Sequence, residues 1–437
     1  MIARAPARRL PLRGADLVLI AMHRLWGGER LSNNTTLVVE CARPIQADRL
    51  RDAFARFLDV CPWPAARLRR PFPWGKLHWA AGERAALVAP PVGETRLPSR
   101  AALQTLVEAE LAAVIDPRRE PPLRATVVEL GGGAGTPAQA ALVMTWFHPL
   151  MDPRGGENLI GHLAHLDQRC EGAPWDGRPP AFVSPRERRP LQERGRLARR
   201  SVDHMRTLMS GSPVSAGTGL ARVGPPRFRQ ATFVPSGPDR RDLWSRLTAV
   251  GCAMAELWRR RGLADVPFLV PVSVDLRAKG EREPTFGNAL AFHFARFKPS
   301  DTTDPAGCER ALRRQFVDAM RDDLIEANAV AMEFLHYRPT WMMLRDLPGT
   351  ASGETFSFNC ADVGEFPPAV GSIFGSQVVN AWHVPAVLPR PGIGVFFNRC
   401  AGRWNLVVSF IEGVVSEDEV ARVIEIVARG MGWTRAI

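Results

Sequence analysis

The sequence lacks a long hydrophobic run, although hydrophobic residues make up 46% of its 437 positions. No apolar stretch reaches the roughly 18 residues that a membrane-spanning helix needs, so a transmembrane segment is not expected. The first residues are basic and have no apolar core of the kind found in signal peptides, so we expect residence in the cytoplasm. With 23% charged residues, the composition is that of a globular protein.

Cysteine patterns typical of metal sites and redox motifs are also missing. The seven cysteines are far apart in the sequence and form no CxxC pair, so we expect them to be reduced and to pack as small hydrophobic residues. His162 and His165 share one face of an expected helix, but no third ligand has matching spacing, which argues against a metal site. There is no glycine-rich phosphate loop and no GxSxG elbow, and we expect no tightly bound cofactor.

Lysine is scarce: only Lys76, Lys279 and Lys298 stand among the 57 basic residues of a chain with a net charge of +12. Eight arginines fall between Arg186 and Arg206. That stretch has no aromatic residue for base stacking and no nucleic-acid-binding motif, so we do not expect a nucleic-acid partner. A basic entrance for an anionic acyl donor, such as a phosphopantetheine group or the nucleotide of CoA, fits the same residues.

The chain is too long for one ordinary core, so two domains are expected. We predict an N-terminal lobe over 1–180, a basic crossover linker over 181–237 with a short helix near 194–209, and a C-terminal lobe over 238–437. Both lobes mix strands and helices in the α+β manner. The expected elements of the second lobe are helices over 239–261 and 307–329, strands over 266–274 and 289–297, a hairpin over 394–411, and a final helix that begins with a capping box at Ser416.

The most informative stretch is His148-Pro-Leu-Met-Asp152. It follows a strand expected over 140–147 and precedes a turn that contains glycine and then a helix. A buried strand that ends on a histidine places an imidazole where the sheet meets a cavity. Imidazole is the side chain best suited to move a proton near neutral pH, so His148 is a candidate catalytic residue. Asp152 can fold back across the turn to fix the loop. An HxxxD string also arises by chance, so its setting decides its meaning.

In this setting the chain resembles the chloramphenicol acetyltransferase-like (HxxxD) acyltransferase superfamily, which includes condensation domains, plant-type alcohol acyltransferases and wax ester synthase/diacylglycerol acyltransferase-like proteins. Four segments carry the resemblance, in the expected order and over nearly the whole chain. They are a strand and helix that end at Pro62, residues 122–130 leading to the His148 motif, residues 270–277 followed by Phe286-Gly-Asn288, and residues 392–398 followed by 404–411 and the last helix.

Two positions depart from the family pattern, and no single subfamily is matched. Many relatives have two adjacent histidines, whereas Phe147 precedes the single His148 here. The second histidine of the pattern is the working one, so this change is tolerable. The glycine that usually follows the aspartate is Pro153. Proline suits the first position of a helix capped by Asp152, and it equally fits a loop reshaped in an inactive member.

The resemblance implies two similar lobes, each with a mixed sheet and helices, and an active-site tunnel between them with His148 near its middle. In such a site Asp152 is structural and pairs with an arginine. Arg277, just after a buried strand, is the candidate partner, and a solvated loop position is the alternative reading of Arg277.

Three further residues complete the candidate substrate-binding set. Asn288 resembles a tunnel-lining asparagine that orients substrate or stabilises the oxyanion, and a turn-forming role is its alternative. Asn359 matches a position near the tunnel in relatives. Gly156 would let the helix start approach the tunnel closely, and it equally fits an ordinary turn.

The activity that the resemblance implies is acyl transfer from a thioester to an alcohol or amine, with His148 as the general base. The donor would be an acyl-CoA or a phosphopantetheine thioester. Three classes of function stay open: an acyltransferase for small-molecule donors and acceptors, a condensation-like enzyme that uses an acyl or peptidyl carrier protein as partner, and a non-catalytic homologue that only binds a ligand or a carrier protein.

Overall fold

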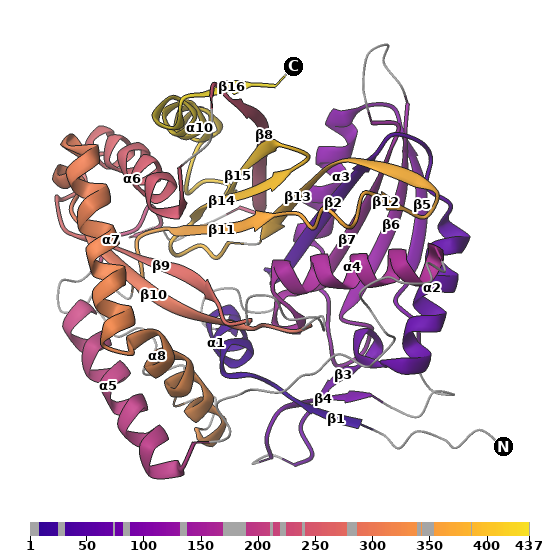
Figure 1. Cartoon of the computed structure of the whole chain (residues 1–437), viewed down its shortest axis with the longest axis horizontal. Coiled ribbons are helices and arrows are strands. Elements are labelled where there is room, and N and C mark those ends of the chain that lie inside the picture. Colours follow the sequence, from indigo (N-terminus) through magenta and orange to yellow (C-terminus); the bar gives the residue numbers. More distant parts are fainter. Residues whose placement is uncertain are drawn as a thin grey trace.

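Two large mixed sheets with attached helices form the two halves of the molecule, which confirms the predicted α+β class with two lobes (Figure 1). The computed structural model describes residues 8–24, 31–72, 75–81, 88–131, 138–168, 189–209, 213–218, 224–237, 241–277, 286–338, 342, 354–385 and 387–436. A small third sheet has the order β1-β4-β3. Its strands are β1 (Arg8–Pro11), β4 (His78–Ala81) and β3 (Arg67–Arg69).

The first large sheet has the order β12-β13-β2-β7-β6-β5. Its strands are β12 (Ser372–Ile373), β13 (Ser376–Pro385), β2 (Asn34–Cys41), β7 (Ala140–Phe147), β6 (Leu123–Leu130) and β5 (Val92–Leu97). Helices α2 (Ala47–Val60) and α4 (Pro153–Gln168) pack on one face, and α3 (Arg100–Ala112) packs on the other. Both faces are therefore covered, which explains why the central strands β2 and β7 are buried at every residue and do not alternate between buried and exposed positions.

The second large sheet has the order β10-β9-β11-β14-β15-β8-β16. Its strands are β10 (Leu290–Phe297), β9 (Phe268–Asp275), β11 (Asn359–Glu365), β14 (Ile393–Cys400), β15 (Arg403–Ile411), β8 (Pro226–Pro235) and β16 (Trp433–Arg435). Helices α6 (Leu243–Arg260), α7 (Pro305–Arg321) and α10 (Glu417–Met431) supply apolar side chains to its core. The capping box at Ser416 is present, as predicted.

Three features differ from the pattern read along the sequence. The single helix expected over 307–329 is two helices, because Asp323 adopts a left-handed conformation (φ 52°) between α7 and α8 (Leu324–Glu333). Strand β8 lies within the expected linker and pairs with β15, while α5 (Leu191–Met209) packs on α8. Strand β13, from the C-terminal half, joins the first sheet beside β2. The boundaries at residues 180 and 238 stay a prediction.

Helix α1 (Gly14–Met22) connects the two halves near the HxxxD turn. It contacts the turn at residues 148–150 and also α8 of the second half. A Cβ at Gly14 would come within 2.3 Å of the Met332 backbone, so only glycine permits this approach to α8. The helix thereby becomes part of the wall beside His148.

Candidate active site

His148 is positioned by the end of a central strand of the first sheet. Strand β7 lies between β2 and β6, and all eight of its residues are buried. The chain then forms a short 3-10 helix, His148–Leu150. The His148 N–H donates a hydrogen bond to the Asn33 carbonyl at 2.7 Å, which fixes the backbone where the strand ends. The imidazole is thus carried by a rigid element.

A cavity of about 290 Å³ lies against His148 and is partly open to solvent. We call it the His148 cavity. Its walls come from the turn that carries His148 and Asp152, from α1, and from strands β9, β10 and β11 of the second half. His148 is partly exposed. The imidazole therefore borders a space that substrate can enter from outside.

Burial lowers the pKa of His148 below its usual value of 6.5. The charge of Asp152 and the backbone of His148 and Met151 act in the opposite direction but do not overcome burial. Nδ1 is buried and has no hydrogen-bond partner among the residues that the structure describes. At neutral pH the ring is uncharged and can accept a proton, which is the state that a general base requires.

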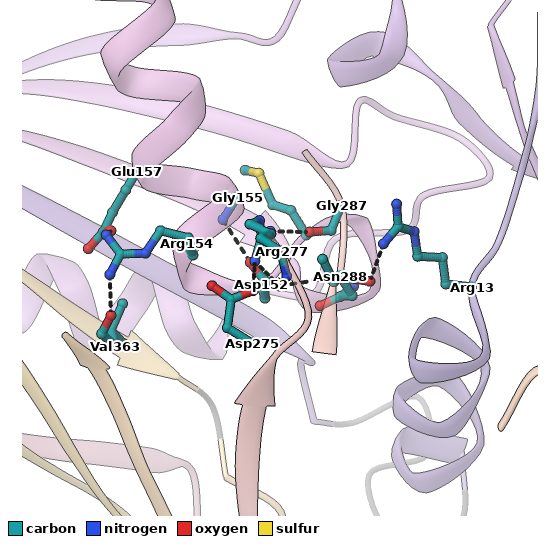
Figure 2. Close-up of polar contacts among 12 residues, drawn as sticks. Arg13, Asp152, Arg154, Gly155, Glu157, Asp275, Arg277, Gly287, Asn288 and Val363 are labelled. Atoms are coloured by element: carbon teal, nitrogen blue, oxygen red, sulfur yellow. Dashed lines mark hydrogen bonds and ion pairs between the residues drawn. The ribbon is translucent and has the colours of Figure 1, made fainter. Parts of the chain in front are cut away.

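Asp152 is committed to internal contacts, as Figure 2 shows. Its carboxylate forms a two-pronged ion pair with Arg277, with N–O distances of 2.9 and 3.1 Å. It also accepts the N–H of Gly155 at 2.7 Å, which caps α4, and the N–H of Ala289 at 2.9 Å. Burial alone would raise the pKa of Asp152, but Arg277 and the two N–H groups outweigh burial and hold the pKa below its usual value.

The proline after the motif is compatible with this arrangement. Pro153 is the first residue of α4, where the missing N–H has no helical partner to lose. The N–H of Gly156 donates to the Asp152 carbonyl at 3.1 Å, so the first turn of the helix is intact. Of the two readings of Pro153, the geometry supports the capped helix start.

Asn288 is buried (1% exposed) behind the HxxxD turn. Its side-chain nitrogen donates to the Asp16 carboxylate at 2.7 Å and to the His148 carbonyl at 3.2 Å. The Asn288 side chain does not line the His148 cavity but lines a second cavity of about 280 Å³ on the Asp16 side. With both amide hydrogens donated, this geometry favours positioning of the His148 backbone, and a direct substrate contact stays a prediction.

The remaining predicted residues differ in their positions. Arg277 and Asn359 line the His148 cavity with His148 and Asp152. Gly156 does not line it. A Cβ on Gly156 would lie 2.7 Å from the ring of Trp146, so this glycine allows α4 to pack closely on β7. The structure therefore brings together His148, Asp152, Arg277 and Asn359, and gives Gly156 a packing contact.

Asp16 is a residue that the sequence interpretation missed. It accepts the Arg13 N–H at 2.7 Å in addition to the Asn288 amide, and burial raises its pKa from 3.8 to about 7. An acidic residue at the third position of a helix is a capping-box signal that could have drawn attention to it. Its link to Asn288 appears only in three dimensions, because the two residues are far apart in the sequence.

A buried polar chain behind α4 was also missed. Arg154 pairs with Glu157 and donates to the Val363 carbonyl (Figure 2). Glu157, with a fully buried side chain, contacts His383 Nε2 at 3.0 Å. The contacts join the helix after the motif to β11 and β13. A glutamate on the apolar side of α4 is the only sequence signal of this chain of contacts.

His162, on α4, packs against an aromatic ring. The His162 ring is 5.2 Å from the Phe57 ring, edge to face.

Among the residues that the structure describes, no group of three or more His, Cys, Asp or Glu side chains is arranged to hold a metal ion. None of the described helices combines the length and the apolar character that a bilayer crossing demands.

Comparison with known proteins gives a clear result only at the level of structure. No protein-family model matches the sequence. No curated protein matches it either. Solved structures match almost the whole chain. Trichothecene 15-O-acetyltransferase from Fusarium sporotrichioides aligns over 97% of this chain and 94% of its own, with a TM-score of 0.68 and 12% identity. The protein has the chloramphenicol acetyltransferase-like acyltransferase fold.

Condensation domains share this acyltransferase fold with the chain. The first condensation domain of the calcium-dependent antibiotic synthetase, in complex with a substrate analogue, covers 97% of this chain and 96% of its own at a TM-score of 0.68 and 16% identity. A variant starter condensation domain of rhizomide synthetase, in complex with C8-CoA and Leu-SNAC, matches at 0.63 and 15% identity, over 97% of this chain and 94% of its own. At these identities the similarity establishes the fold that the sequence resemblance predicted.

Proposed function

We propose that the protein is an acyltransferase that moves an acyl group from a thioester to an alcohol or amine, with His148 as the general base. The observation that carries the proposal is the position of His148, which is partly exposed at the wall of a cavity between the two lobes and whose pKa is lowered by burial. The acyltransferase fold, shared with an O-acetyltransferase and with condensation domains, supports the same reaction class.

The chemistry follows from the position of the base. The acceptor O–H or N–H gives its proton to His148 as the acceptor atom attacks the thioester carbonyl carbon. The tetrahedral intermediate then collapses, the C–S bond breaks, and the proton passes from His148 to the departing sulfur. Because Nδ1 is buried, Nε2 is the nitrogen that would exchange this proton. No acyl-enzyme is needed, since both substrates can reach one site.

The donor is proposed to be an acyl-CoA or a phosphopantetheine thioester. One structural neighbour was solved with C8-CoA and Leu-SNAC, and another with a substrate analogue. Asp152 and Arg277 would keep the loop that carries His148 in place, and Asn359 would contact substrate from β11. Asn288 is proposed to hold the His148 carbonyl.

The test is the turnover of thioesters by the wild-type protein and by His148→Ala. A panel of acyl-CoA and carrier-bound donors is offered with alcohol and amine acceptors. We expect His148→Ala to lower kcat by roughly 10²- to 10⁴-fold, the usual contribution of a general base. Because the pKa of His148 is lowered from 6.5, the acidic limb of the wild-type kcat/KM profile should lie below pH 6.5.

His165→Ala is the matched control, since His165 lies on α4 but does not line the His148 cavity. It should retain wild-type turnover and thermal stability. Full activity of His148→Ala would remove the proposed base.

A condensation-like enzyme is the second candidate, because the matched structures include condensation domains of two synthetases. It differs from the first in its donor. Faster turnover of carrier-protein thioesters than of the same acyl-CoA would select it. Binding of a carrier protein with no acyl transfer to any acceptor would instead indicate the non-catalytic homologue.

A further inference from the structure

One wall of the His148 cavity is an apolar strip on strand β10. Leu290, Phe292 and Phe294 lie at alternate positions, are partly exposed and line the cavity. The intervening residues Ala291 and His293 are buried on the opposite face. A strand face that borders solvent normally carries polar side chains. Here it offers a continuous apolar surface to the interior of the cavity.

Helix α1 provides apolar side chains to the same cavity. Val18, Leu19 and Met22 line it, and α5 adds Met205. Side chains of this kind gain free energy when an apolar ligand displaces water from them. The cavity volume of about 290 Å³ suits a slender ligand, since it lies at the small end of ligand pockets.

The charged residues that line the cavity are already paired within the protein. Asp152 and Asp275 both contact Arg277. The other two charged residues that line the cavity also have partners: Arg154 pairs with Glu157, and Asp362 pairs with Arg246. A charged ligand group would have to compete with these internal partners, whereas an uncharged chain would not.

The strip has a defined start and a defined end. Its start is beside the motif, because the N–H of Ala289 donates to Asp152 at 2.9 Å. Its end is Phe294, because Arg296, the next residue on this face, does not line the cavity. Phe294 is four positions after Leu290 in an antiparallel strand, a distance of roughly 14 Å. An extended chain advances about 1.2 Å per bond, so about twelve bonds, or roughly twelve to thirteen carbons, span this length.

We propose that the His148 cavity binds an unbranched aliphatic chain of about twelve carbons, laid along β10 with its reacting end at His148 and its length limited by Phe294. The inference rests on the proposed function for the identity of the reacting end. The chain belongs either to the acyl group of the donor or to an alkyl alcohol acceptor, and the two sources share one chemistry.

The experiment measures equilibrium binding by calorimetry, so that it does not depend on turnover. The ligands are N-acetylcysteamine thioesters from butanoyl to hexadecanoyl and, separately, the corresponding straight-chain alcohols. Both wild type and His148→Ala are titrated. We expect affinity in one series to rise roughly three- to four-fold per added methylene until the chain has about twelve carbons, and then to stop rising.

Variants of Phe294 test the end of the strip. We call the chain length at which affinity stops rising the break. Phe294→Ala removes the ring and should move the break to chains longer by roughly three carbons, because the freed space is about that size. Phe294→Trp should move the break to shorter chains. Phe294→Leu, a milder change, should shift it in the same direction as Phe294→Ala. Phe72→Ala is the control, because Phe72 is 58% exposed and outside the cavity.

The outcomes separate the two proposals. Affinity that does not depend on chain length in either series, or Phe294 variants with the wild-type break, would overturn the chain site. A break in binding together with no acyl transfer would retain the chain site and reject the acyltransferase function. Transfer without any chain-length dependence would do the reverse.

Discussion

Asp152 illustrates how a motif residue can matter without touching the reacting atoms. Its carboxylate accepts N–H groups of Gly155 and Ala289 and pairs with Arg277. All of these contacts hold backbone and side chains in place around His148. The lowered pKa of Asp152 means that it keeps its charge, so proton transfer falls to the imidazole.

Asp16 should make the stability of the protein depend on pH. The folded protein retains a proton on Asp16 up to about pH 7, whereas the unfolded chain loses it near 3.8. The native state therefore binds more protons between these values, so the free energy of unfolding falls as pH rises through this window. The loss is on the order of 4 kcal/mol, since each pKa unit is about 1.4 kcal/mol. Asp16→Asn should remove this part of the pH dependence of the free energy of unfolding.

Urea unfolding at a series of pH values from about 4 to 8 checks the prediction. Asp16→Asn should gain stability relative to wild type as pH rises to about 7 and hold a constant difference above it. Asp48→Asn, at an exposed position on α2, should run parallel to wild type. Parallel curves for Asp16→Asn and wild type would show that Asp16 is ionised in the folded protein throughout.

At the scale of elements, the close packing of α4 on β7 depends on one glycine. Gly156→Ala would place a methyl group against the ring of Trp146, which is fully buried and whose Nε1–H donates to the Met151 carbonyl at 2.8 Å. The ring cannot easily move. Overpacking costs about 1–3 kcal/mol and should exceed the gain of about 1 kcal/mol in helix propensity.

Thermal and urea unfolding of two glycine variants separate these effects. Gly156→Ala should be less stable than wild type. Gly195→Ala, in helix α5, meets no atom within 4 Å and should be more stable by up to about 1 kcal/mol. Equal gains at both positions would mean that α4 has room at Gly156.

The break between α7 and α8 shows where periodicity misleads at this scale. Apolar spacing continues across residues 307–329, and it predicts one helix. Asp323 interrupts it with a positive φ, which aspartate tolerates better than most residues. The bend lets α8 approach both α1 and α5, so the interruption helps to build the region beside the His148 cavity.

For the whole molecule, the pair Asp152–Arg277 joins a turn of the first lobe to the end of β9 in the second. Both side chains are nearly buried, at 5% and 10% exposure. Asp152→Asn should lower the free energy of unfolding by about 3–5 kcal/mol, because Arg277 would stay buried without its partner charge. Asp152→Asn combined with Arg277→Met should lose less than the sum of the two single changes.

A double-mutant cycle in urea measures this coupling. The exposed pair Arg51–Glu94 is the control, and its loss should change stability by less than about 1 kcal/mol. Additive losses for Asp152 and Arg277 would mean that the buried pair does not couple the lobes.

The amino-acid sequence by itself determined the local elements and the motif. Apolar runs placed β7 and β9, helical spacing placed α2 and α6, and Ser416 marked the start of α10, because these signals act within a few residues. The same local logic placed His148 at a strand end, and the family resemblance proposed Arg277 as the partner of Asp152.

Only the tertiary structure decided which distant segments share a surface. It added β13 to the first sheet, connected Asp16 through Asn288 to the His148 backbone, and placed Gly156 against Trp146 and away from the cavity. It also showed that the outer face of β10 lines the cavity. Contacts between residues hundreds of positions apart depend on how whole sheets and helices pack together, and local sequence patterns carry no record of that packing.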